Sequence, residues 1–196
     1  TAVARGRAAH AGVSHREGAN AIWALARFVD AAQGLTDYAR GLTVNVGKLT
    51  GGQGKNTVPD EATALLDLRF ESAADGAWLE QRLRDAARVA AEGVPGTSVQ
   101  LTGGVSRLPL ERTPESAVLM DRYLEAARAV GLGAGEAPLI GGGSDASTAF
   151  AMGIASIDGL GPRGVGFHTK DEQIERATLV RKAQALARFL LATVRA

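Results

Sequence analysis

The chain has 196 residues, 45% of them hydrophobic, and its 22 basic and 21 acidic side chains leave a net charge of +1. This near-neutral balance gives no electrostatic reason to expect nucleic acid or an anionic membrane as a partner, and no apolar run approaches the roughly 18 residues of a membrane span. The absence of cysteine excludes disulfides and thiolate metal sites.

The first predicted element is a strand over residues 1–8, where apolar and polar residues alternate. Ser14 and Glu17 then have the spacing of a capping box, which predicts that a helix begins beside them. Gly34 provides a stop for this helix. The face that we expect it to bury consists of Ala19, Ile22, Leu25, Ala26 and Val29.

Two more strands are predicted over residues 42–46 and 62–70, because apolar residues alternate with polar ones in both segments. In the second of these strands, Asp67 and Arg69 fall on the face opposite the apolar side chains. Both are therefore expected to face away from the core.

A second helix is predicted to end before Gly93, and residues 97–101 predict a fourth strand. The resulting order, β-α-β-β-α-β, is the ferredoxin-like arrangement, so we expect one unit over residues 1–106. The helical spacing behind this prediction is that of Leu79, Leu83, Ala86, Ala87 and Ala90.

The remaining residues, 107–196, predict three helices and only one or two strands. Thr113 followed by Pro114 is a good helix start, and residues 153–160 predict a buried strand. Such a set suits the edge of a larger sheet, so the chain as a whole is assigned to the α/β (α+β) class. The apolar stripes are Leu119, Tyr123, Ala127 and Val130 for the first helix, and Leu179, Ala183, Leu186, Leu190 and Val194 for the last.

The chain begins at Thr1 without a methionine, inside a predicted strand, so we expect it to be a piece of a longer protein. Nothing in the sequence decides between a cytoplasmic and an exported location. The absence of cysteine also removes the redox state of the compartment as a clue.

The glycine-rich stretch "GGQGKNT", residues 51–57, looks at first like a phosphate-binding loop. In such a loop Ser or Thr follows the lysine directly, and a glycine stands five residues before the second glycine. Here Asn56 follows Lys55, and Leu49 occupies the position of that glycine. We therefore exclude a nucleotide site and interpret the stretch as a flexible turn between strands.

A second glycine-rich stretch, "GGGSDAS", covers residues 141–147 and precedes a predicted short helix. Its consecutive backbone amides can bind a carboxylate, with the Ser144 hydroxyl as a further donor. It can equally be a tight turn in which Ser144 or Asp145 caps the helix. From this segment alone the two interpretations are evenly balanced.

Each histidine also admits two interpretations. His168, in "GFHTKDE", lies on a predicted turn, and neutral imidazole is a good zinc ligand. A zinc site needs about three protein ligands, and no His-x-Asp or His-Glu-x-x-His pattern accompanies His168, so its segment alone favours an ordinary loop histidine. His10, at the end of a strand, is equally ambiguous, and His15 is expected to face solvent.

Arg69 and Asn56 are the remaining candidates. The guanidinium of Arg69 can grip a substrate carboxylate through two parallel hydrogen bonds, or it can simply pair with Asp67. Asn56, just before Val58 and Pro59, can cap its own loop or donate its amide to a ligand.

Taken together and in order, four motifs are more specific than any one of them. "GRAAHAG", "NTVPDEATALLDLRF", "GGGSDAS" and "DGLGPRGVGFHTKDE" resemble the zinc-dependent exopeptidase and deacylase family. That family includes glutamate carboxypeptidase, acetylornithine deacetylase and succinyl-diaminopimelate desuccinylase, and the resemblance is strongest to the glutamate carboxypeptidase-like members. It covers essentially the whole chain.

The resemblance implies that residues 1–106 form a lid that mediates dimerisation, and that residues 107–196 are the last part of a catalytic metallopeptidase domain. It also implies roles for single residues. His168 matches the last metal ligand of a site for two zinc ions, and His10 matches a lid histidine that reaches across the dimer to polarise the scissile carbonyl. The residues that match the substrate site are Asn56, Arg69, Gly142, Gly143 and Ser144.

In the family, the other metal ligands and the glutamate that acts as general base precede the lid, and they are missing from this chain. We therefore expect a fragment of a homodimeric zinc hydrolase that cleaves amide bonds of small peptides or N-acyl amino acids, including C-terminal glutamate-like substrates. Alone, the fragment is expected to be inactive. The alternatives are a stand-alone dimerisation or ligand-binding module without catalysis and, less favoured, an amidohydrolase with another metal arrangement.

Overall fold

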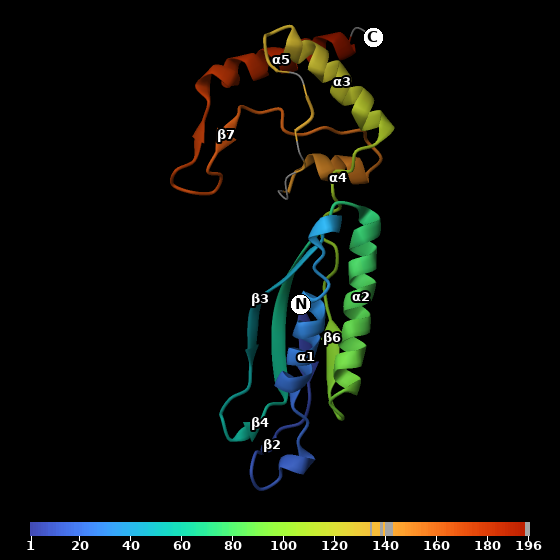
Figure 1. Cartoon of the computed structure of the whole chain (residues 1–196), viewed down its shortest axis with the longest axis vertical. Coiled ribbons are helices and arrows are strands. Elements are labelled where there is room, and N and C mark those ends of the chain that lie inside the picture. Colours follow the sequence, from blue (N-terminus) through green and yellow to red (C-terminus); the bar gives the residue numbers. More distant parts are fainter. Residues whose placement is uncertain (134, 138, 140–142, 195–196) are drawn as a thin grey trace. The chain divides into compact units, whose positions relative to one another are not determined.

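In the computed structural model, the chain folds as two units, Thr1–Pro109 and Leu110–Ala196, each with its own cluster of buried apolar side chains (Figure 1). The described residues are 1–133, 135–137, 139 and 143–194. Among them, no helix is both long enough and apolar enough to cross a membrane.

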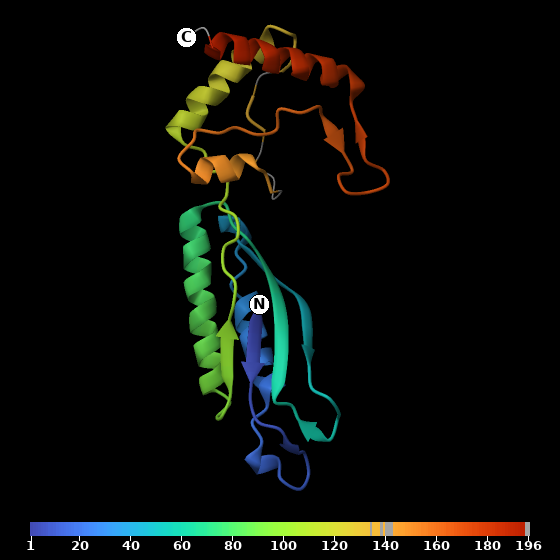
Figure 2. The ribbon, with the colours of Figure 1, turned by 180° about the vertical axis from the view of Figure 1, so that it is seen from behind.

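A four-stranded antiparallel sheet is the frame of the first unit (Figures 1 and 2). Its spatial order is β3-β5-β1-β6, so the first and third sheet strands of the chain lie at the centre. This order, with a helix after each of those two strands, confirms the predicted ferredoxin-like arrangement. The strands are β1 (Ala2–Arg5), β3 (Thr43–Gly51), β5 (Glu61–Arg69) and β6 (Ser98–Leu101).

The helices α1 (Ala21–Gln33) and α2 (Ala73–Glu92) pack against one face of this sheet. Small strand residues on that face leave room for large side chains from the helices, which is how a thin unit reaches dense packing. The fully or almost fully buried set includes Ala2, Ala4, Ala62 and Ala64 from the strands and Leu25, Phe28, Leu79 and Leu83 from the helices.

The start of α1 differs from the prediction. Ser14 makes no side-chain capping bond, and its hydroxyl instead accepts a hydrogen bond from the His10 amide at 3.3 Å. The helix begins six residues later, where the side chain of Asn20 accepts from the Trp23 amide at 2.9 Å. The face that α1 turns toward the sheet carries Ala21, Ala24, Leu25, Phe28 and Ala32, so the prediction that Ala26 is buried was wrong.

Short elements complete the first unit. A two-stranded sheet pairs β2 (Ala9–His10) with β4 (Thr57–Val58). The unit also contains two 3-10 turns, η1 (His15–Glu17) and η2 (Tyr38–Arg40). Together, β2, β4 and η1 form an extension beyond the Glu61 end of β5. The main ladder ends where Arg5 pairs with Glu61, and one further hydrogen bond, from the Gly6 amide to the Asp60 carbonyl, leads into the extension.

The second unit contains α3 (Pro114–Arg128), α4 (Ala146–Ala151), α5 (Arg176–Val194) and a hairpin of β7 (Gly164–Val165) with β8 (Gln173–Ile174). The helix start at Thr113 is confirmed, since Thr113 and Ser116 cap each other reciprocally. The buried apolar residues are Tyr123, Ala127, Leu132, Ala185 and Phe189.

Two predictions for this unit were wrong. Residues 153–160 form no strand, because no neighbouring strand among the described residues offers them a ladder of hydrogen bonds, and Ile154 is 56% exposed. The helix α5 is present, but its inward face carries Thr178, Ala185 and Phe189. The predicted stripe of α5 is mostly exposed, as Leu190 at 52% shows.

Candidate functional site

Two of the candidate residues, His10 and Asn56, are brought together by the β2–β4 pairing. His10 lies opposite Thr57 in the register, and the Ala11 amide donates to the Asn56 carbonyl at 2.9 Å. Both side chains are exposed. The sequence placed these residues 46 positions apart, so their proximity is a result of the fold.

The ring of His10 is held in a defined orientation by its own backbone. Nδ1 accepts hydrogen bonds from the amides of Gly12, at 3.1 Å, and Val13, at 3.0 Å. An imidazole nitrogen that accepts two N–H groups carries no proton, so the neutral ring carries its proton on Nε2. His10 is therefore arranged to donate a hydrogen bond from Nε2.

Arg69 lies at the opposite end of the unit. It is the last residue of β5, whose nine residues begin at Glu61, next to the extension that carries His10. At about 3.3 Å per residue, the two ends of this strand are about 26 Å apart. As predicted, Arg69 shares the open face of the sheet with Asp67, and its Nε lies 2.8 Å from an oxygen of that carboxylate.

His168 occupies the turn of the β7–β8 hairpin, with an exposed side chain. Its φ of 63° lies in the left-handed region, which costs a residue with a Cβ about 1–2 kcal/mol. Thr169 closes the turn, since its amide and hydroxyl both donate to the Gly166 carbonyl, at 3.1 and 2.7 Å. A histidine kept in a conformation that favours glycine suggests that its imidazole has a use at this position.

Only residues 143–147 of the "GGGSDAS" stretch belong to the described part of the chain. Gly142 lies outside the described residues, and Gly143 is exposed and irregular. The Ser144 hydroxyl accepts from the Ala146 amide at 3.1 Å, which closes a local turn just before α4. The N-cap position of α4 is Asp145, and no side-chain capping bond is made there.

The described residues contain no group of three or more His, Asp or Glu side chains that could hold a metal ion. His168 therefore belongs to no such group among them. The part of the chain that the structure describes does not by itself fit a zinc site.

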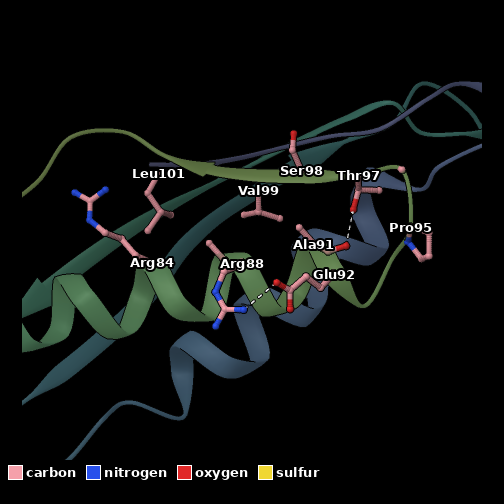
Figure 3. Close-up of a pocket in the computed structure, with 11 residues that line it drawn as sticks. Arg84, Arg88, Ala91, Glu92, Pro95, Thr97, Ser98, Val99 and Leu101 are labelled. Atoms are coloured by element: carbon pink, nitrogen blue, oxygen red, sulfur yellow. Dashed lines mark hydrogen bonds and ion pairs between the residues drawn. The ribbon is translucent and has the colours of Figure 1, made fainter.

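One feature that the sequence did not reveal is a groove of about 670 Å³ between the carboxyl-terminal half of α2 and the outer strand β6 (Figure 3). Val99 and Leu101 of β6 point toward the helix, while Ser98 points away. The helix contributes Ala87 and Ala91, together with the charged residues Arg84, Arg88 and Glu92. In the sequence, the segment that forms β6 is distinguished only by its lack of lysine and proline. This feature is too weak to predict a groove beside it.

The first unit is similar to a known family. Residues 1–95 match the family model described as the peptidase dimerisation domain, M20_dimer. Carboxypeptidase G2 of a Pseudomonas species is 26% identical over 187 residues, which cover 95% of this chain and 45% of that protein. Succinyl-diaminopimelate desuccinylase of Gluconacetobacter diazotrophicus is 32% identical over 149 residues, 76% of this chain and 35% of that protein.

Solved structures show the same fold over the whole chain. A tripeptidase from Staphylococcus aureus has a TM-score of 0.80 and 27% identity. The match covers 100% of this chain and 51% of the tripeptidase. A Bacillus subtilis peptidase of the M20 family, described as a dinuclear metal binding peptidase, has a TM-score of 0.70 at 18% identity. The match covers 99% of this chain and 49% of that protein. The chain thus spans about half the length, or less, of the proteins that it matches.

Proposed function

Because this chain is a relative of the M20 peptidases and its first 95 residues are a peptidase dimerisation domain, we propose that it supplies the lid and the closing segment of a homodimeric, metal-dependent amidohydrolase. Its relatives are hydrolases. The proposed substrates are small peptides or N-acyl amino acids with a free carboxylate, such as a C-terminal glutamate.

The observation that carries the proposal of a shared site is the separation of His10 from Arg69. The two lie beyond opposite ends of β5, about 26 Å apart along the strand. A dipeptide spans about 7 Å when extended, so one chain cannot apply both residues to one small substrate. A two-fold dimer removes the difficulty, because each site can then take His10 and Asn56 from one chain and Arg69 from the other.

Within such a site, His10 acts as a donor. With both amides of the turn bound to Nδ1, the Nε2–H is the group that can hydrogen-bond a carbonyl oxygen as negative charge develops on it. A donor of this kind stabilises the transition state more than the substrate, and losing one costs roughly 100- to 1000-fold in kcat. Asn56, which directly precedes β4, is placed to donate its side-chain amide beside it.

Arg69 holds the free carboxylate of the substrate. In this structure its guanidinium is bound to Asp67, with both side chains more than half exposed, so the pair is weak and can be exchanged. A substrate carboxylate competes for the same donors. The planar fork of arginine favours this exchange because it forms two parallel hydrogen bonds with a carboxylate.

When bound, two zinc ions would polarise the substrate carbonyl and lower the pKa of a bound water. His168 would be one of their ligands, and we propose that the others come from residues outside this chain. Since the described residues do not form a metal site, no catalytic step is assigned through the metal.

The proposal about Arg69 is tested in the complete protein with an N-acylated glutamate and its matched carboxamide, which lacks the free carboxylate. Arg69→Ala is expected to raise KM about 10- to 100-fold for the glutamate and to leave the carboxamide unchanged, because charge-assisted hydrogen bonds are worth about 1.5–3 kcal/mol. The control is Arg5→Ala, which removes an exposed, ion-paired arginine near the other end of the sheet. An unchanged KM for the glutamate in Arg69→Ala, or an equal rise in KM for both substrates, would refute the role.

The second candidate function is a dimerising module without catalysis, favoured by the lack of a ligand cluster in the described residues. Zinc bound per chain, measured after dialysis, separates the possibilities for this chain. We expect little zinc. Near-stoichiometric zinc that is lost in His168→Gly, a change that also relieves the positive φ, would mean that the chain has metal ligands beyond those identified.

The residues encoded upstream in the gene then distinguish a hydrolase from a module. A His-x-Asp motif followed by a Glu-Glu pair would support the hydrolase, since these are the ligand and base types that a dinuclear zinc site requires. Chelation of the complete protein should then abolish hydrolysis.

A further inference from the structure

Most of the extension that carries His10 has charge of one sign. Residues 6–16 and 51–59 contain no aspartate or glutamate, and the next acidic residues along the chain are Glu17 and Asp60. The whole chain, by contrast, has almost equal numbers of basic and acidic side chains. The basic residues of the two segments are Arg7, Arg16 and Lys55, besides His10 and His15. A surface with charge of one sign attracts ligands of the opposite sign, so the extension favours an anionic ligand.

The cations of the extension differ in what they bind. The Nε of Arg7 donates to the Glu17 carbonyl, so this guanidinium ties one segment of the extension to another. The side chain of Lys55 is exposed, and its ammonium makes no hydrogen bond or ion pair to any other residue that the structure describes. Lys55 can therefore bind a ligand without breaking a contact within the chain.

A tight turn sets the position of Lys55 relative to His10. The Thr57 amide donates to the Gly54 carbonyl at 3.3 Å, so Lys55 and Asn56 are the two central residues of a β-turn. Thr57 lies directly opposite His10 in the register of β4 with β2. Since Lys55 is two residues from Thr57, its Cα lies within about 7 Å of the Cα of the residue that faces His10.

Both turns are held by backbone hydrogen bonds. After His10, the Ser14 amide donates to the His10 carbonyl at 3.2 Å, in addition to the two amides that bind the imidazole Nδ1. The Ala11 amide donates to the Asn56 carbonyl at 2.9 Å, which ties the turn of Lys55 to the strand of His10. A ligand that accepts a hydrogen bond from His10 Nε2 is thus within reach of the Lys55 ammonium, which ends a flexible four-carbon stem.

We propose that Lys55 is a specificity-determining residue, which binds a second carboxylate of the substrate while His10 donates to the scissile carbonyl. This inference rests on the proposed function, in which Arg69 from the other chain holds the first carboxylate. The second carboxylate belongs either to the side chain of the amino acid that follows the scissile amide or to the acyl group that precedes it. In both cases the preferred substrate is a dianion.

A lysine suits this position better than an arginine does. An ammonium is a compact charge with three donors on a flexible stem, so it can meet a carboxylate that approaches from different directions. Arginine requires the planar approach that two parallel hydrogen bonds impose. The stretch before Lys55, "GGQG", has glycine at three of its four positions, so few side chains crowd the approach to the ammonium.

The test uses the complete protein and three N-acyl amino acids. N-acetylglutamine has one carboxylate, N-acetylglutamate adds a second on the side chain, and N-succinylglutamine adds a second on the acyl group. Lys55→Met should raise KM about 10-fold for one of the two dianions and leave N-acetylglutamine unchanged, because a charge-assisted hydrogen bond is lost. The dianion that is affected identifies the source of the second carboxylate.

Reversing the charge gives a result that a damaged turn cannot imitate. In Lys55→Glu, KM should fall several-fold for the matching cationic substrate, because attraction replaces repulsion at this position. That substrate is α-N-acetyllysine if the side chain carries the second carboxylate, and β-alanylglutamine if the acyl group does. A KM for this substrate that does not fall would overturn the contact.

Two further variants separate a local contact from a general effect of charge. Arg16→Met removes another exposed cation of the extension, and Lys48→Met removes an exposed lysine of β3. Both should leave the preference for the dianion unchanged, and an equal loss of preference in Arg16→Met would overturn a local contact at Lys55.

The outcomes also distinguish this inference from the proposed function. Hydrolysis of all three substrates with KM values that Lys55→Met leaves unchanged, or raises equally, would overturn the role of Lys55 alone. If the complete protein hydrolysed none of the three, the proposed function would fail and this inference with it.

Discussion

The two units differ in how much apolar surface they bury by themselves. In the first, Phe28, Leu25, Leu42 and Leu79 are fully buried between the sheet and its helices. In the second, a small cluster around Tyr123 forms the core. Many of its large apolar side chains remain exposed, including Val118, Met152, Ile154, Phe167, Val180, Leu191 and Val194.

This difference shows that local signals are not enough to make a unit self-sufficient. The helix α3 begins with a complete capping box, as good a start as any in the chain. Yet the Tyr123 hydroxyl is buried without a hydrogen-bond partner among the described residues, and burial raises its pKa. An unsatisfied buried group beside extensive exposed apolar surface is unusual for a unit that is stable by itself.

The strongest test of this comparison removes the same side chain from each unit. Phe28→Ala should lower the free energy of unfolding by about 3–5 kcal/mol, because it empties a fully buried site. Phe167→Ala, at a residue 59% exposed, should cost less than about 0.5 kcal/mol. Urea unfolding of both variants measures the values, and similar losses would mean that Phe167 is buried in solution and that the second unit buries more apolar surface than the structure shows.

Removing a cap from each unit should instead have equal effects. Asn20→Ala and Thr113→Ala each delete one N-cap bond, at a cost of about 1 kcal/mol to the helix concerned. Ser14→Ala is the control, since Ser14 caps no helix. Hydrogen exchange in α1 and α3 reports both helices separately. If Ser14→Ala loosened α1 as much as Asn20→Ala, the assigned helix start would be wrong.

A polar substitution on the exposed apolar surface of the second unit should cost little stability. Leu191→Lys replaces a side chain that is 58% exposed, so the free energy of unfolding should change by less than about 0.5 kcal/mol. Binding of a hydrophobic dye and aggregation should both fall, because the apolar patch is interrupted. Loss of helical circular dichroism in this variant would show that Leu191 is packed in solution.

The smallest expected effect on stability comes from an acidic residue in the first turn of one helix in each unit. Hydrogen bonds from Ser72 and then Arg40 lower the pKa of Asp75 below its usual 3.8. Its own backbone and Thr113 lower the pKa of Glu115. Each group therefore adds stability that is full above its unfolded pKa and is lost as the pH falls through its folded pKa.

Asp75→Asn and Glu115→Gln should both reduce the loss of stability between pH 5 and pH 2, by small and similar amounts. Thermal unfolding over this range measures the change. A steeper acid dependence in either variant would contradict the direction of these pKa shifts.

The ferredoxin-like fold was predictable because each sheet strand alternates clearly and each helix has one apolar face. The exceptions occur where a tertiary contact decides the outcome. Ser14 has good capping spacing, but its hydroxyl supports the His10 turn, and Asn20 takes the cap. Residues 153–160 have the composition of a buried strand, yet a strand also requires a neighbour.

The candidate site was only partly predictable. Motif order identified His10, Asn56, Arg69 and His168 as residues of interest. It gave no distances, so neither the pairing of His10 with Asn56 nor the position of Arg69 at the far end of β5 was foreseen.

The most direct test of a site shared between two chains is complementation between two inactive variants of the complete protein. His10→Ala and Arg69→Ala, each expected to lose most of its activity at glutamate concentrations below the wild-type KM, are mixed under conditions that exchange subunits. Half of the dimers are then mixed, and each contains one intact site of two, so the account predicts recovery of about one quarter of wild-type activity. If His10 and Arg69 serve a site within the same chain, no activity will return on mixing, and the shared site would be contradicted.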